Sequence, residues 1–140
     1  MCVSDRSSPR AAILIIEDDD ATATDLQIGL RGAGYAVRRA ASANEAFVSL
    51  KSTHADLILM SLLLPDADGL ILCSTLKARF TAPVIVLSAR PREVDRALAL
   101  ESGALEMLGL PIDVDDLLTI VNSQLPAASF QRSKATQLSS

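Results

Sequence analysis

Short apolar runs alternate with helix-like segments along this chain, and the alternation restricts the fold more than any single residue does. Four apolar runs are residues 11–17, 56–60, 83–87 and 104–108, and a fifth strand-like segment, residues 36–39, carries two arginines that suit a sheet edge. The segments between them place apolar residues at helical spacing. Repeated strand-helix units pack as a parallel sheet with helices on both faces. We therefore predict an α/β protein whose core is a doubly wound, five-stranded parallel sheet of the (βα)5 type.

Local signals place the helices between these runs. Helices are expected over residues 20–32, 68–80 and 91–102, in a segment that starts after Ser42 and in one that starts after Asp113. Ser42 and Glu45 have the spacing of a capping box, and Pro91 suits the first turn of a helix. Gly103 is expected to end that helix, and Asp113 to cap the last one.

The composition agrees with one globular domain. The chain has 140 residues, of which 49% are apolar, and it can bury a substantial core. We expect this domain to cover residues 11–125. Residues 1–10 are expected to be a flexible N-terminal segment. Residues 126–140 contain no acidic residue and are expected to be a disordered tail or a linker remnant.

The composition also excludes several functions. No apolar run approaches the roughly 20 residues of a membrane span, and the first ten residues lack the apolar segment of a signal peptide. The net charge of −4 gives no basic footprint, so we expect no nucleic-acid binding. Cys2 and Cys73 are too few for a disulfide framework, and Cys73 falls in a helical pattern as a core residue. These features indicate a cytoplasmic protein.

Polar residues follow the carboxyl ends of the predicted strands. An acidic run begins at Glu17, Ser61 follows the third strand and Ser88 the fourth, while the fifth is followed by a Leu-Pro pair at Leu110. In order and spacing these pieces resemble the receiver domain of bacterial two-component response regulators over about residues 11–125. The resemblance implies a flavodoxin-like sheet of order 2-1-3-4-5, which binds ligands at the carboxyl edge of its strands.

Positions that would carry the family's chemistry are altered. The resemblance implies that a phosphoryl group passes from a phosphohistidine to an Asp, beside a Lys and Mg²⁺. Here Ser61 is in place of the phosphoacceptor Asp, and Leu110 is in place of the Lys. Met107 is in place of the switch aromatic, and Ser88 matches the switch hydroxyl. The family also leads us to expect a cis bond before Pro111.

The acidic pair Glu17 and Asp18 matches the family's metal-holding residues. Mg²⁺ needs several oxygen ligands, and Ser61 removes one of the three expected carboxylates. We therefore expect Mg²⁺ binding to be weak or lost, and we expect no other cofactor. The alternative is that Glu17 and Asp18 form a solvated acidic turn that holds no metal.

Ser61 is not expected to replace the Asp as a nucleophile. A hydroxyl must be deprotonated by a neighbouring base, and the one histidine, His54, is expected at the opposite end of the third strand. We interpret Ser61 as a small polar residue that relieves repulsion with Asp18. No catalytic residue is predicted, and the chain is not expected to be an enzyme.

The first hypothesis is thus a pseudo-receiver that signals by binding proteins without being phosphorylated. The family's usual partner surface would carry Arg92, Glu93, Arg96 and Glu106. Its partner would be a histidine kinase, another regulator or a second copy of the chain. A solvated charged face is the alternative interpretation of these residues.

Two other hypotheses stay open. The chain could accept a phosphoryl group on a non-standard acid, namely Asp19, Asp66 or Asp68, although acids in a Pro-Asp-x-Asp-Gly stretch are more often turn residues. Alternatively, the chain is the receiver part of a transcription regulator whose output domain is absent. Its 140 residues contain no helix-turn-helix and no basic patch.

Overall fold

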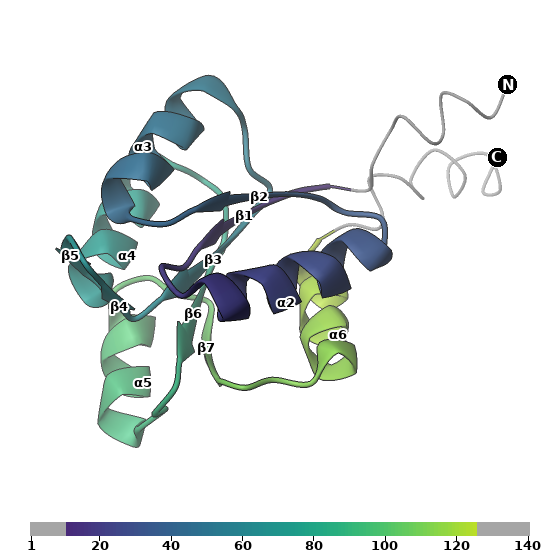
Figure 1. The fold of residues 1–140 in the computed structure, drawn as a ribbon. Helices are drawn as coiled ribbons and strands as arrows, with labels where there is room; N and C mark the ends of the chain where they lie inside the picture. Colours follow the sequence, from purple (N-terminus) through teal and green to yellow (C-terminus); the bar gives the residue numbers. More distant parts are fainter. Residues whose placement is uncertain (1–10, 126–140) are drawn as a thin grey trace, which may run out of the picture.

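Five parallel strands form the central sheet of the computed structural model, which describes residues 11–125 (Figure 1). In chain order the strands are β1 (Ala12–Ile16), β2 (Ala36–Ala40), β3 (Leu57–Ser61), β6 (Val84–Ser88) and β7 (Glu106–Gly109). Their order across the sheet is β2-β1-β3-β6-β7, which confirms the predicted order 2-1-3-4-5. The expectations for residues 1–10, Cys2 included, and for residues 126–140 lie outside the described residues.

Five helices cover the two faces of this sheet. They are α2 (Asp20–Gly32), α3 (Ala43–Ser52), α4 (Gly69–Arg79), α5 (Glu93–Glu101) and α6 (Val114–Gln124). Helices α3, α4 and α5 pack on one face, and α2 and α6 pack on the other (Figure 1). In the part of the chain that the structure describes, no helix is long and apolar enough to cross a membrane.

Alternating residues of the strands supply two separate cores. On β3, Ile58 and Met60 face the α3–α5 layer, whereas Leu57 and Leu59 face the α2–α6 layer. All four are fully buried. A strand buried on both faces must be apolar throughout, which is why the sequence shows continuous apolar runs rather than alternation. Cys73 is buried in the first core, as expected.

The start of α5 and one bond of the α3 capping box differ from the sequence prediction. Helix α5 begins at Glu93 with Arg92 as its N-cap, so the prediction that Pro91 forms its first turn is wrong. In α3, the Ser42 hydroxyl accepts from the Glu45 N–H as predicted. The Glu45 carboxylate, however, accepts from the N–H of Ala41 at 2.8 Å rather than from that of Ser42. The capping box is therefore displaced by one residue toward β2.

A small hairpin between β3 and α4 was not predicted. Its strands are β4 (Leu63–Leu64) and β5 (Ala67–Asp68), which pair antiparallel. The Gly69 N–H donates to the Leu62 carbonyl at 2.9 Å and closes this loop. Two-residue strands carry almost no periodicity, so apolar patterning cannot reveal them.

Two predicted backbone features are present. The Leu110–Pro111 peptide bond is cis. Gly103 has a φ of +105°, a conformation that favours glycine, and it follows the end of α5 as predicted.

Candidate functional site

The carboxyl edge of the sheet brings together the candidate residues of the first, third and fourth predicted strands. Ile16 of β1 pairs with Met60 of β3, so Glu17 and Ser61 follow these partners at the same level of the sheet. Ser61 in turn pairs with Leu87, one residue before Ser88. His54 lies before β3, at the opposite edge, where its Nε2 is 2.9 Å from Asp56 Oδ1.

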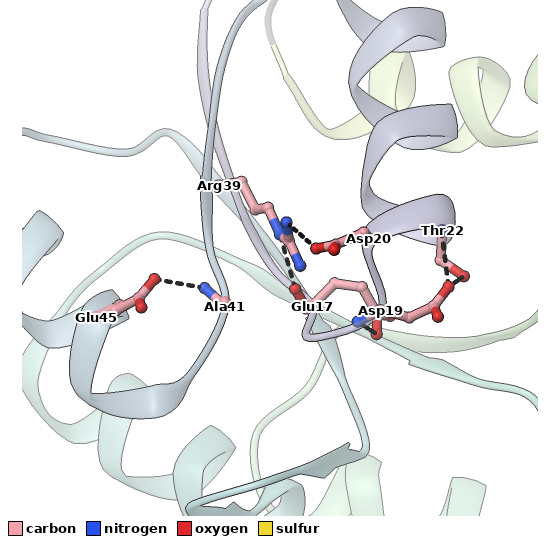
Figure 2. A network of polar contacts seen from close by, with 7 residues as sticks. All are labelled: Glu17, Asp19, Asp20, Thr22, Arg39, Ala41 and Glu45. Atoms are coloured by element: carbon pink, nitrogen blue, oxygen red, sulfur yellow. Dashed lines mark hydrogen bonds and ion pairs between the residues drawn. The ribbon is translucent and has the colours of Figure 1, made fainter.

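The acidic loop, residues 17–20, connects β1 to α2 (Figure 2). Each of three carboxylates in this loop has a local partner. Glu17 Oε2 accepts from the Asp19 N–H at 3.0 Å. Asp19 caps α2 by accepting from the N–H of Thr22 at 2.9 Å and from its hydroxyl at 2.6 Å. Asp20 pairs with Arg39.

Arg39 reaches the acidic loop from β2. Its Nε donates to the Glu17 carbonyl at 2.9 Å, and its Nη1 lies 2.7 Å from Asp20 Oδ1 (Figure 2). Its Nη2 is buried and has no hydrogen-bond partner among the described residues. The loop therefore contains a fixed cationic group beside its acids.

Burial changes the acidity of one of these acids. Glu17 is only 4% exposed, although it lies in the loop. The pKa of its carboxyl is raised, chiefly because burial opposes ionisation. The bond from the Asp19 N–H opposes this shift, and the neighbouring Asp18 adds to it. Asp18 itself is exposed.

Ser61 and Ser88 use their hydroxyls in local turns. The Ser61 hydroxyl donates to the Leu63 carbonyl at 3.0 Å, in the hairpin that follows it. The Ser88 hydroxyl accepts from the Arg90 N–H at 3.1 Å, and Ser88 is buried. Neither contact is to a group that would deprotonate a serine for nucleophilic attack.

The residues predicted to be in place of the Lys and the aromatic are both apolar and packed. Leu110 is half-buried and packs against the core on the α2–α6 side. Met107 is 4% exposed and belongs to the core on the opposite face. The site thus has no cation at Leu110 to bind a phosphate and no ring at Met107 to move.

The acids present do not fit a Mg²⁺ site. Mg²⁺ demands near-octahedral oxygen ligands, usually with one or two carboxylates and waters. Here Glu17 and Asp19 bond to backbone N–H groups of their own loop and of α2. Within residues 11–125, no three Asp, Glu, His or Cys side chains form a group that could hold a metal ion.

The acids considered as alternative phosphoacceptors are all helix caps. Asp66 accepts from the N–H groups of Ala43 and Asn44 at 2.9 and 3.0 Å, and so caps α3 from the hairpin. These bonds lower the pKa of Asp66. Asp68 caps α4 through the N–H groups of Leu70 and Ile71. Asp19 caps α2, as described above.

The predicted partner surface lies on α5 and β7. Arg92 pairs with Asp95 at 2.9 Å, and Arg96 pairs with Glu106 across the two elements, also at 2.9 Å. Glu93 is exposed. Four apolar side chains of α5 and of the residue before β7 are also exposed, namely Val94, Leu98, Leu100 and Leu105.

Sequence analysis missed the contacts of Arg39 with the acidic loop and interpreted Arg39 as a sheet-edge residue. A signal was available in the pair Arg38-Arg39. Neighbouring strand residues point to opposite faces, so one of the two arginines had to face α2. Arg38 faces the other layer, where it bonds to the Ser49 hydroxyl and to the carbonyls of Thr53 and His54.

Comparison with known proteins places these observations in context. The sequence pattern described as "Response regulator receiver domain" matches residues 13–122. DNA-binding response regulator MtrA of Mycobacterium tuberculosis is 33% identical over 116 residues, 83% of this chain and 51% of the relative. Transcriptional regulatory protein AfsQ1 of Streptomyces coelicolor is 36% identical over 101 residues, 72% and 45% of the two chains. The chain thus spans about half the length of the curated relatives it matches.

Solved structures with the same fold cover most of the described residues. A putative response regulator from Chloroflexus aurantiacus has a TM-score of 0.78 and 34% identity, covering 83% of this chain and 97% of that one. The receiver domain of the TMAO respiratory system response regulator TorR has a TM-score of 0.76 and 32% identity, covering 81% and 94%.

Proposed function

Because this chain belongs to the family of response regulator receiver domains, we propose that it acts in signal transduction as a receiver that binds proteins without being phosphorylated. The observation that carries the proposal is Ser61. It ends β3 at the carboxyl edge, and its hydroxyl is bonded to the hairpin carbonyl of Leu63. The proposal makes the chain a binding module of the cytoplasm rather than an enzyme.

The physical argument concerns what a phosphoryl group would meet at this edge. A carboxylate is already ionised at neutral pH, whereas a serine needs a base, and His54 lies at the other edge of the sheet. Leu110 presents an apolar side chain where charge-assisted bonds would hold the phosphate. These two changes act together, because both the acceptor and its counter-charge are lost.

The chain would then bind its partner through the α5–β7 surface in its unphosphorylated form. The Arg96–Glu106 ion pair joins the two elements, and Leu98 and Leu105 are 41% and 42% exposed beside it. A mixed apolar and charged surface of this kind suits a protein partner, such as a histidine kinase, another regulator or a second copy of the chain. Met107 is packed in the core, so the proposal involves no movement of an aromatic ring.

The competing acceptors Asp19, Asp66 and Asp68 are less favoured. Phosphorylating any of them would replace a carboxylate that already caps a helix. A capping acid stabilises its helix through bonds to the otherwise unpaired N–H groups. The proposal is compatible with a longer regulator, because the DNA-binding and transcriptional relatives are about twice as long as the matched region.

The deciding measurement is the intact mass of the protein after incubation with Mg²⁺ and a small acyl-phosphate donor. We expect no gain in mass and no change in the sedimentation coefficient. A receiver domain that keeps its phosphoacceptor Asp serves as the positive control under the same conditions. A gain of one phosphoryl group would contradict the proposal, and Asp-to-Asn variants at positions 19, 66 and 68 would then locate it.

A further inference from the structure

We propose that Arg39 has taken the place of a bound cation in the acidic loop, so that the loop holds its shape without a divalent metal and excludes one. This inference goes beyond the proposed function, because it concerns the metal-holding part of the edge rather than the phosphoacceptor. It names a residue of β2 that the family resemblance did not suggest.

Two directed bonds place the guanidinium in the loop. Its Nε donates to the main-chain carbonyl of Glu17 at 2.9 Å, and its Nη1 pairs with Asp20 at 2.7 Å (Figure 2). The first bond fixes the backbone at the end of β1, and the second fixes the start of α2. One planar group therefore joins both ends of the acidic loop, with the fork geometry that arginine offers and lysine does not.

The Arg39–Asp20 pair differs from an ordinary surface ion pair because one of its partners is largely buried. Asp20 has a side chain that is 90% exposed, and an exposed pair of this kind contributes little by itself. The Arg39 side chain, however, is only 22% exposed, and its Nη2 is buried without a partner among the described residues. A guanidinium keeps its charge at all ordinary pH values. The loop therefore contains a permanent, largely buried positive charge that the acids around it must balance.

Three of the four acids in the loop bond to groups of the protein, whereas Asp18 is exposed. Glu17 and Asp19 direct carboxylate oxygens to N–H groups, and Asp20 directs one to Arg39. A Mg²⁺ ion at this loop would have to compete with these bonds and bind beside a like charge. Arg39 thus supplies the positive charge that a metal supplies in a metal-binding loop.

The proposal makes a prediction about restoring the family's site. The double variant Ser61→Asp, Leu110→Lys returns the missing carboxylate and the missing cation. We expect it still to bind Mg²⁺ poorly, because Arg39 remains in the loop. Adding Arg39→Met, which keeps an unbranched apolar stem and removes the charge, should strengthen Mg²⁺ binding at least tenfold. Titration calorimetry with MgCl₂ measures both affinities.

Two control variants in the same double-variant background separate charge from general disturbance. Arg38→Met removes the neighbouring arginine, which faces the other side of β2, and should leave the Mg²⁺ affinity unchanged. Arg39→Lys keeps a cation and should bind Mg²⁺ no better than the background. Equal affinities with and without Arg39 would overturn the proposal.

A measurement on the wild-type chain keeps the test decisive if the Arg39 variants fail to fold. We expect the amide signals of residues 17–20 in a ¹H–¹⁵N spectrum to be unaffected by millimolar Mn²⁺. Saturable broadening confined to these signals would show a metal in the loop and overturn the proposal. Neither result alters the phosphodonor test, so the failure of one idea is distinguishable from the failure of the other.

Discussion

Glu17 buries a carboxyl group one residue beyond β1, and this burial raises its pKa. The folded protein therefore keeps the proton to a higher pH than the unfolded chain does, and stability falls as pH rises through that interval. Glu17→Gln keeps an oxygen for the Asp19 N–H but cannot ionise. We expect this variant to be more stable than the wild type at pH 7, with the difference shrinking as the pH falls through that interval and gone once the pH is below the ordinary pKa of a glutamate. Urea unfolding between pH 4 and 8 measures it.

The control for this prediction is Glu101→Gln, which removes one negative charge from the exposed end of α5. Subtracting its effect leaves the contribution of burial at Glu17. A Glu17→Gln variant that is less stable than the wild type at pH 7 would contradict the prediction.

Single residues also show where sequence reasoning stops. The identities of Ser61 and Leu110 could be read directly from the chain, since strand ends and a Leu-Pro pair mark their positions. The bonds of Arg39 could not, because they depend on β2 lying beside β1 and on the Glu17 carbonyl turning toward it. A contact between a side chain and a distant main-chain atom does not change the spacing of apolar residues in the sequence, so that spacing cannot predict it.

At the scale of elements, α4 begins against the hairpin with no room for a side chain. A Cβ added to Gly69 would lie 2.2 Å from the Leu62 carbonyl oxygen, a main-chain atom that cannot rotate away. Gly69→Ala should therefore destabilise the protein by about 1–3 kcal/mol, as overpacking does. Gly32→Ala is the matched control, because nothing lies within 4 Å of its added Cβ. That variant should gain roughly 0.5–1 kcal/mol from helix entropy.

Thermal or urea unfolding of the two glycine variants checks this prediction. Equal changes in the free energy of unfolding at Gly69 and Gly32 would show that the hairpin can move aside without loss of stability, and would contradict the prediction. A loss confined to Gly69 would agree with a hairpin held closely against the helix.

The element pattern was the part that the sequence could predict best. Helix α2 has the predicted bounds, because Asp19 caps it and the apolar stripe ends before Gly34. The start of α5 was misjudged because proline is suited to a first turn but does not require one. The hairpin was missed because it is specified by the Asp66 cap and the Gly69 approach, which involve other elements.

At the scale of the whole molecule, the two cores lie on opposite faces of the same sheet, and alternating residues of the central strands belong to one core or the other. Met60 is fully buried on the α3–α5 side, whereas Tyr35 is buried on the α2–α6 side and bonds to Asn122. Met60→Ala should cost about 2–5 kcal/mol. Because the sheet joins both layers, we expect tyrosine fluorescence and far-ultraviolet circular dichroism to shift together.

Tyr35 is a clean reporter for this experiment, since the chain has one tyrosine and no tryptophan. The measurement is urea unfolding of the wild type and Met60→Ala followed by both probes. A fluorescence midpoint that stays at its wild-type value while the helix signal shifts would show that the layers unfold separately.

The closed hairpin has a consequence for engineering. The two ends of the segment from Leu62 to Gly69 lie side by side, because the Gly69 N–H donates to the Leu62 carbonyl. Lengthening a loop whose ends already meet adds only about 0.6 kcal/mol of closure entropy per doubling. Leu63, at 78% exposed, offers an entry point that leaves the Asp66 cap in place. The hairpin is thus a natural place to graft a foreign peptide, two residues after Ser61 at the carboxyl edge of the sheet.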